Sequence, residues 1–177
     1  PPTEVTVPGV TRYQDIITRV GSIRHYDPLP HITAHDVPWS EKKDGASFRG
    51  TLTGERNDFE TSDKARAKMT DMERCMNLPR CRLAYQTTNS TIVDAKLSDT
   101  YRKVPKVLNG RILVGASMGY KESQSYKGII MIEGNDISTG LKWALYSNSV
   151  VLIPKPTKSS WMMEELLEPW VHYIHLK

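Results

Sequence analysis

The 177-residue sequence has few cysteines and no long apolar run, and each shortage narrows the class of protein. The two cysteines, Cys75 and Cys81, are too few for a disulfide framework and lack the partner residues of a zinc site. They form either one disulfide bridge, as in an oxidising lumen, or two buried free thiols. The sequence does not decide between these two alternatives. No apolar stretch reaches about 18 residues, and the first residues lack the charged-then-apolar order of a signal peptide. We therefore expect no membrane span and no intact signal peptide in this chain.

The sequence also lacks a basic tract and a dinucleotide fingerprint. The net charge of +4 comes from 24 Lys and Arg against 20 Asp and Glu, and the basic residues are spread along the chain. Nucleic acid is therefore unsupported as a partner, whereas an anionic small molecule such as a nucleoside diphosphate fits the charge. The missing G-x-G-x-x-G pattern disfavours a dinucleotide enzyme. With 38% hydrophobic residues, the chain is an ordinary globular one that is long enough for one sizeable core.

The first 38 residues are rich in proline and poor in periodic apolar positions, so we expect an extended lead-in over 1–38 and one domain over 39–177. His25, His31 and His35 lack a supporting carboxylate pattern, which favours surface or structural histidines over a metal site. Because the chain opens on Pro1 rather than methionine, we expect the natural N-terminus, and any targeting segment, to lie upstream.

Residues 62–77 predict a long helix with Ser62 as its cap and Met69, Met72 and Met76 along one face. Pro79 is expected to end it. After this segment, Asn89-Ser90-Thr91 matches the N-glycosylation pattern, which by itself does not settle the compartment.

The C-terminal third predicts a βαβ unit. Residues 129–132 and 150–153 are unbroken apolar runs, typical of parallel strands that are covered on both faces. Between them, Leu141, Ala144 and Leu145 give the apolar stripe of a helix, and Asp136 or Ser138 can cap its first turn. The predicted fold class is α/β, a Rossmann-like parallel sheet with flanking helices.

The turn Glu133-Gly134-Asn135-Asp136 lies between the first of these strands and the helix. A glycine and several exposed amides at a helix N-terminus accommodate a phosphate. The alternative is an ordinary structural βα turn, which the residues taken alone favour.

A second polar segment follows a predicted strand at residues 47–52. Arg49 and Arg56 flank two hydroxyl residues, and guanidinium groups pair with phosphate oxygens in charge-assisted, bidentate bonds. A surface loop with solvated arginines is the alternative that the residues alone favour.

The two segments together resemble glycosyltransferase family 90, which includes protein O-glucosyltransferases of the endoplasmic reticulum, fungal capsule xylosyltransferases and bacterial lipopolysaccharide-type enzymes. The resemblance runs from Trp39 to Leu176. It is carried by Phe48-Arg49-Gly50-Thr51, by the stretch from Gly134 to Lys142, by Asn148-Ser149-Val150-Val151-Leu152 and by the ending Glu168-Pro169-Trp170-Val171-His172-Tyr173-Ile174. Glu-Gly-Asn-Asp and Leu-Lys-Trp-Ala-Leu are closer to the lipopolysaccharide-type and algal members than to the animal enzymes.

The resemblance implies the donor-binding half of the two-domain architecture called GT-B, as the C-terminal part of a longer family domain. The nucleotide-sugar site it implies consists of Arg49, Gly50, Thr51, Thr53, Arg56, Arg66, Asp94, Gly134, Asn135, Asp136, Ser138, Thr139 and Lys142. Where the animal enzymes carry an arginine this chain has Gly140, so Lys142 is expected to supply the positive charge. Two of these residues have an alternative structural role. Arg66 is alternatively a solvated helix residue, and Asp94 is alternatively a turn former at a strand end.

By implication the protein transfers a glucose- or xylose-like sugar from a UDP-sugar to an acceptor hydroxyl on a protein or glycan. The sequence has no DxD-type metal triplet, which agrees with metal-independent members, so no cofactor or metal is expected beside the UDP-sugar. No general base can be matched: Asp36 occupies the family's Asp-x-Pro-Trp neighbourhood but is interpreted as structural. The alternative function is a nucleotide-binding or interaction module without turnover. A eukaryotic source would place the protein in the secretory lumen, and a bacterial one at the cytoplasmic membrane face.

Overall fold

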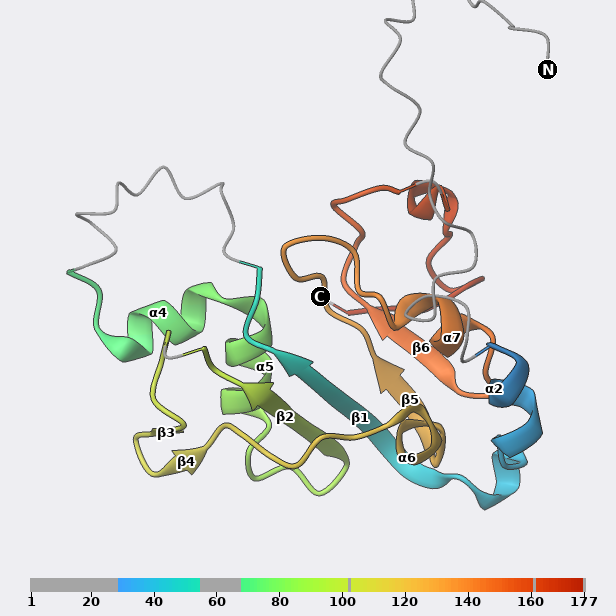
Figure 1. The fold of residues 1–177 in the computed structure, drawn as a ribbon, viewed down its shortest axis with the longest axis horizontal. Coiled ribbons are helices and arrows are strands. Elements are labelled where there is room, and N and C mark those ends of the chain that lie inside the picture. Colours follow the sequence, from blue (N-terminus) through green and yellow to red (C-terminus); the bar gives the residue numbers. More distant parts are fainter. Residues whose placement is uncertain (1–28, 55–67, 102, 161, 177) are drawn as a thin grey trace, which may run out of the picture.

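The structure is a computed structural model, and it describes residues 29–54, 68–101, 103–160 and 162–176. Its centre is a five-stranded sheet in the order β2-β1-β5-β6-β7. All four neighbouring pairs are parallel. The strands are β1 (Lys43–Thr51), β2 (Val93–Asp99), β5 (Tyr126–Ile130), β6 (Val150–Ile153) and β7 (Ile174–His175) (Figure 1). The predicted α/β, Rossmann-like sheet with flanking helices is confirmed.

Helices and short elements connect and flank the strands. They are α2 (Leu29–His35), η1 (Trp39–Glu41), α4 (Asp71–Asn77), α5 (Pro79–Gln86), α6 (Tyr120–Gln124), α7 (Leu141–Leu145) and η2 (Glu164–Leu166). A two-stranded antiparallel hairpin, β3 (Val107–Leu108) with β4 (Arg111–Ile112), lies between β2 and α6. Residues 29–35 of the predicted lead-in form α2, which buries Ile32, rather than an extended segment. Residues 1–28 lie outside the described residues.

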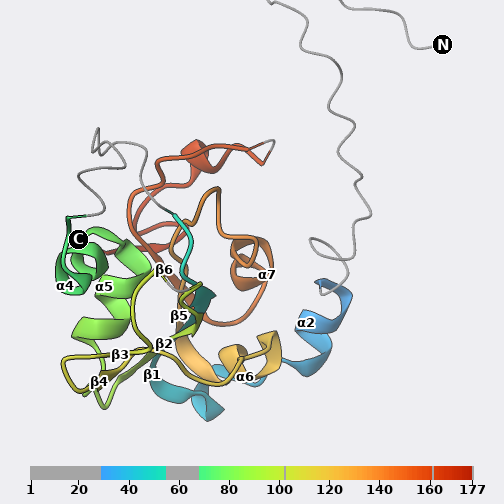
Figure 2. The ribbon, with the colours of Figure 1, turned by 60° about the vertical axis from the view of Figure 1, so that its left-hand side comes forward.

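Side chains alternate between the two faces of the sheet along every strand. Apolar residues therefore point to both faces, and both faces are covered. On one face, Phe48, Leu97 and Ile130 pack with residues of α4 and α5. On the other, Ile129 and Val151 pack with residues of α7. Figures 1 and 2 show α4 and α5 on one side of the sheet and α7 on the opposite side. The unbroken apolar runs thus reflect burial on both faces, as parallel strands require.

The pair α4 and α5 is joined by a disulfide between Cys75 and Cys81, whose Cα atoms are 5.1 Å apart. Both cysteines are fully buried in the core cluster that includes Phe48 of β1 and Leu52, the residue after that strand. Of the two alternatives that the sequence left open, the bridge is the one observed.

A long helix was predicted over 62–77, but within the described residues the helix starts later than predicted. Residues 55–67, including the proposed cap Ser62, lie outside the described residues, and α4 begins only at Asp71. The reason is a capping box: Thr70 Oγ1 accepts from Glu73 N–H, and the Glu73 carboxylate accepts from Thr70 N–H. Pro79 begins α5 at its first turn, where a missing N–H costs nothing.

Candidate functional site

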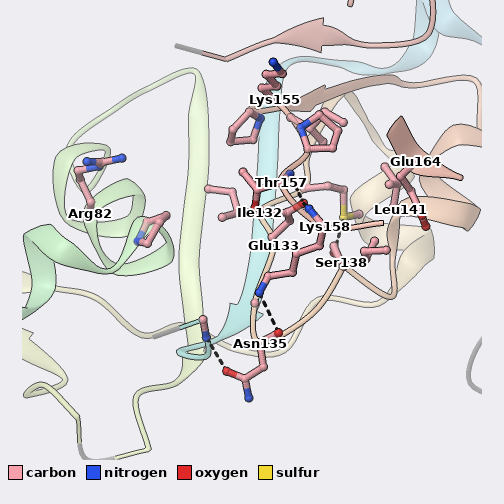
Figure 3. A pocket seen from close by; sticks show the side chains of 18 residues that line it. Arg82, Ile132, Glu133, Asn135, Ser138, Leu141, Lys155, Thr157, Lys158 and Glu164 are labelled. Carbon is pink, nitrogen blue, oxygen red and sulfur yellow. Dashed lines mark hydrogen bonds between the residues drawn. The ribbon is translucent and has the colours of Figure 1, made fainter. Parts of the chain in front are cut away.

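A cavity of about 570 Å³ opens where β5 and β6 end. This strand edge is where parallel α/β sheets bind ligands. We call it the strand-end cavity. Three segments form most of its wall: the turn after β5, the segment after β6 and the N-terminal part of α5 (Figure 3). Its lining includes Gly54, Pro79, Arg82, Glu133, Gly134, Asn135, Ser138, Leu141, Lys155, Thr157, Lys158 and Glu164.

The loop after β1 and the turn after β5 meet at this cavity. The backbone N–H of Gly54 donates a 2.9 Å hydrogen bond to Oδ1 of Asn135 (Figure 3). The two segments approach each other closely. A Cβ on Gly54 would lie 3.0 Å from the backbone of Gly134, and a Cβ on Gly134 would lie 2.4 Å from Thr53 Oγ1. Gly54 also has a φ of +88°, which side-chain-bearing residues rarely adopt. Glycine is therefore required on both sides of the contact.

Arg80 of α5 forms hydrogen bonds to the same two segments, a role that was not predicted from the sequence. Its Nη1 donates to Thr51 O and Thr53 Oγ1, both at 2.9 Å, and its Nη2 donates to Ile132 O at 2.7 Å. Burial lowers the pKa of the Arg80 guanidinium below its ordinary value. The only sequence signal was an arginine at the start of a helix, and that helix itself was not predicted.

The segment after β6 is held against the turn after β5. The Glu133 carboxylate accepts hydrogen bonds from the backbone N–H of Thr157 at 2.9 Å and of Lys158 at 3.2 Å. In return, Lys158 Nζ donates to Asn135 O at 2.9 Å (Figure 3). These reciprocal bonds fix the width of the strand-end cavity, and they engage the carboxylate of Glu133.

Within the turn after β5, several amides are already used, which differs from the predicted phosphate cradle. Gly134 N–H donates to Asp136 O at 2.9 Å, and Ile137 N–H donates to Asp136 Oδ1 at 2.8 Å. Neither Asp136 nor Ser138 caps α7, which has only five residues and no side-chain cap. The predicted cap is wrong because Asp136 closes its own turn and Ser138 Oγ donates to the Met131 sulfur. The α7 dipole is correspondingly small.

Two exposed cationic side chains outside the predicted set line the strand-end cavity. Arg82 lies on α5, and Lys155 follows β6 (Figure 3). Neither side chain forms a hydrogen bond or ion pair with another described residue. An anionic ligand would meet these two cations without having to displace another described residue.

Arg49 belongs to a different place. Its guanidinium forms a 2.9 Å ion pair with Asp94 and donates to Asp94 O at 2.9 Å and to Ala116 O at 3.1 Å. Together with Tyr126 it lines a second, shallower cavity of about 390 Å³. Since Arg49 and Asp94 project from neighbouring strands on one face of the sheet, the structure brings these two predicted residues together. It does not place Arg49 with Gly134 in the strand-end cavity, as the sequence analysis expected.

Tyr126 completes this second group by donating its hydroxyl to Asp94 Oδ2 at 3.1 Å. Its partial burial, reinforced by the hydrogen bond and negative charge of Asp94, raises the pKa of Tyr126 above its ordinary value.

The other predicted site residues divide as follows. Gly134, Asn135 and Ser138 line the strand-end cavity. Thr51 and Thr53 accept hydrogen bonds from Arg80, and Gly50 lies beside that guanidinium. Asp136 and Thr139 are exposed, and Lys142 is half-buried in the first turn of α7. Arg56 and Arg66 lie outside the described residues.

Asp36 has a structural role in the described chain. Its carboxylate forms a fully buried ion pair with Lys42 and accepts from the backbone N–H of Val37 and Asn148. Lys42 Nζ also donates to Gln124 O. These bonds join the segment after α2 to the segment before β6, and they leave Asp36 without access to an acceptor.

Within the four described ranges, no group of three His, Cys, Asp or Glu side chains could hold a metal ion. No helix in the same ranges is long and apolar enough to cross a membrane.

Two comparisons with known proteins bear on this site. No protein-family model matches the chain. A stretch of 60 residues is 45% identical to the O-glucosyltransferase LpsA of Dichelobacter nodosus, and this stretch is 34% of the chain and 19% of that protein. The chain thus spans about a fifth of the length of the curated relative it matches, and over that stretch it is related to a glycosyltransferase.

Proposed function

We propose that this chain is the donor-binding part of a family 90 glycosyltransferase of GT-B architecture. It would bind a UDP-sugar in the strand-end cavity and transfer a glucose- or xylose-like sugar to an acceptor hydroxyl of a glycan or protein. The observation that carries the proposal is the meeting of two loops, joined by Gly54 and Asn135, at the carboxyl edge of a parallel sheet. The similarity to an O-glucosyltransferase over 60 residues supports the same reaction class.

The charges in the cavity support a diphosphate as the group that is bound. Arg82 offers a guanidinium fork and Lys155 a point charge, and both lie in the cavity wall. In a departing nucleoside diphosphate, negative charge develops on the leaving oxygen, so cations nearby lower the barrier to transfer. Such a site needs no metal ion, which is the form of the reaction that we propose here.

The uridine and sugar would occupy the remaining, more apolar wall. Met131, Ile137 and Leu141 lie on the α7 side of the cavity, and Ile153 with Pro154 lies at the end of β6. Apolar walls with a few placed polar groups are typical of nucleotide and sugar sites. The volume of about 570 Å³ is within the range of sites for ligands of this size.

One observation favours a second candidate, a module that binds the donor but does not turn it over by itself. The two carboxylates in the cavity wall, Glu133 and Glu164, are engaged by Thr157 and by Ser160. Asp36 is buried in an ion pair. No lining carboxylate in the described part of the chain is therefore ready to accept a proton from an acceptor, so the base would have to come from outside the described residues.

Thermal-shift titration with UDP, GDP and NAD, followed by donor hydrolysis with the complete polypeptide, tests both candidates. The proposal predicts stabilisation by UDP and release of free sugar from UDP-sugar. Stabilisation by UDP without sugar release or transfer would support the binding module. Stabilisation by NAD with indifference to UDP would overturn both.

A further inference from the structure

The turn between α5 and β2 carries an exposed acceptor for N-linked glycans. We propose that Asn89 is glycosylated, and that the chain matures in an oxidising lumen. Asn89 and Thr91 form an Asn-Ser-Thr triplet, and no other asparagine in the sequence is followed two positions later by serine or threonine. Both residues are exposed, and the turn lies between the end of α5 and the start of β2.

The local structure keeps the acceptor accessible. The α5 helix ends at Gln86, and the hydroxyls of Thr87 and Thr88 satisfy two of its last carbonyls. Ser90 Oγ accepts from the backbone N–H of Ile92 and Val93, which closes a small turn with the middle residue of the triplet inside it. The hydrogen bonds that shape the turn therefore use Ser90 rather than the two residues that a glycan transferase recognises.

The disulfide is an independent observation that points to the same compartment. Cys75 and Cys81 are bridged and buried, and they are the only two cysteines in the sequence. Bridges of this structural kind form and persist in lumenal and extracellular environments and are rare in reducing ones. N-linked glycans are added in the same oxidising lumen in eukaryotic cells. The bridge and the exposed triplet thus point independently to the same cellular location.

The position is also compatible with the strand-end cavity. Asn89 precedes the first residue of β2, whereas the cavity lies beyond the last residues of β5 and β6. Because the strands are parallel, these are opposite edges of the sheet. In Figure 1 the turn after α5 lies below the sheet and the loop after β5 lies above it. A glycan on Asn89 would leave the entrance of the cavity open.

The modification would proceed by group transfer from a lipid-linked oligosaccharide diphosphate. The amide nitrogen of Asn89 attacks C1 of the first sugar, so a C–N bond forms while the bond from C1 to the diphosphate oxygen breaks. The lipid diphosphate leaves with the electron pair, and the amide proton passes to a base of the glycan transferase. The hydroxyl of Thr91 is the recognition group at the second position after the asparagine.

Expression of the polypeptide with its natural flanking sequence in cultured eukaryotic cells, followed by peptide-N-glycosidase digestion and mass spectrometry, tests this proposal. We expect one glycan, its loss on digestion with deamidation located at Asn89, and its absence in Asn89→Gln and Thr91→Ala. Thr91→Ser should keep the glycan, as should Asn148→Gln, a change at an exposed asparagine outside any such triplet. Alkylation without reduction should leave both cysteines unmodified.

Three outcomes would overturn the proposal: an unmodified wild-type mass, a glycan that persists in Asn89→Gln, or cysteines that are alkylated without reduction. An unchanged melting temperature of Thr91→Ser relative to wild type controls for folding. None of these readouts depends on glycosyltransferase activity, so they are separate from the test of the proposed function.

Discussion

The backbone N–H of Gly54 and the side-chain oxygen of Asn135 are 2.9 Å apart, although 81 residues separate them in the sequence. This hydrogen bond joins the loop after β1 to the turn after β5 at the mouth of the strand-end cavity. Two adjacent parallel strands end at the same edge, so such a contact can form only when both loops turn inward. It is the structural basis of the proposed diphosphate site.

Asn135→Ala should lower the free energy of unfolding by about 1 kcal/mol, the usual net value of one hydrogen bond. Asn135→Asp keeps an acceptor for Gly54 N–H and should retain most of the stability, but it adds a negative charge beside the proposed diphosphate. Its affinity for UDP should therefore fall more than its stability. Urea unfolding and UDP titration of both variants check this. An Asn135→Ala variant as stable as wild type would show that the contact contributes nothing.

Arg80 and Arg82 lie on the same helix and should have separable effects. Arg80→Ala leaves the partly buried carbonyls of Thr51 in β1 and of Ile132 after β5 without this donor and should cost about 3 kcal/mol of unfolding free energy. Arg82→Ala removes an exposed cation from the cavity wall and should change stability by less than about 0.5 kcal/mol while weakening UDP binding. Arg80→Lys keeps the charge but not the fork and should recover only part of the lost stability. A large stability loss in Arg82→Ala would contradict this division.

The bridge between α4 and α5 closes a short loop, and its removal should destabilise the fold moderately. For a sequence separation of 6, restriction of the unfolded chain predicts about 2 kcal/mol. The Cys75→Ala/Cys81→Ala double variant should therefore show a correspondingly lower urea midpoint. Tyr126→Phe, on the other face of the sheet, should be additive with it. Equal stability with and without the bridge would indicate that packing alone holds α4 on α5.

Tyr126 predicts a dependence of stability on alkaline pH. Its pKa is raised in the folded state, so the folded protein holds the phenol proton more tightly than the unfolded chain does. The stability that this provides is full below about pH 10, where the unfolded tyrosine is protonated, and is lost as the pH rises through the folded-state pKa. Above about pH 10, stability should fall more steeply for wild type than for Tyr126→Phe. If urea unfolding shows the same pH dependence of the unfolding free energy for both proteins, this assignment to Tyr126 is wrong.

The sequence predicted the elements whose signal is local and strong. Residues 150–153 correspond to β6, and Leu141 to Leu145 form α7, because continuous apolar runs and an i, i+3, i+4 stripe have few alternative structures. The start of α4 was misplaced because the capping box at Thr70 overrides a methionine periodicity that continues N-terminally. The α5 helix was missed because Pro79 was interpreted as an ending, although proline fits equally well at a helix start.

The candidate site was predicted in part, and the limit is physical. Gly134, Asn135 and Ser138 lie in the cavity wall because they belong to the segment between β5 and α7, which sequence can locate. Arg49 is also next to a strand end, but the direction of its side chain depends on Asp94 in a neighbouring strand. Arg80, Arg82 and Lys155 reach the site from elements whose packing is a property of the whole fold. Sequence adjacency carries no signal for such contacts.

The most direct test of the account is where UDP binds. An amide ¹H–¹⁵N titration of the chain with UDP should shift the signals of Gly54, Gly134, Asn135 and Ser138 and of Lys155, Thr157 and Lys158, and Arg82→Ala/Lys155→Ala should weaken these shifts. Shifts centred instead on Arg49, Asp94 and Tyr126, or none at millimolar UDP, would contradict the placement of a nucleotide sugar in the strand-end cavity.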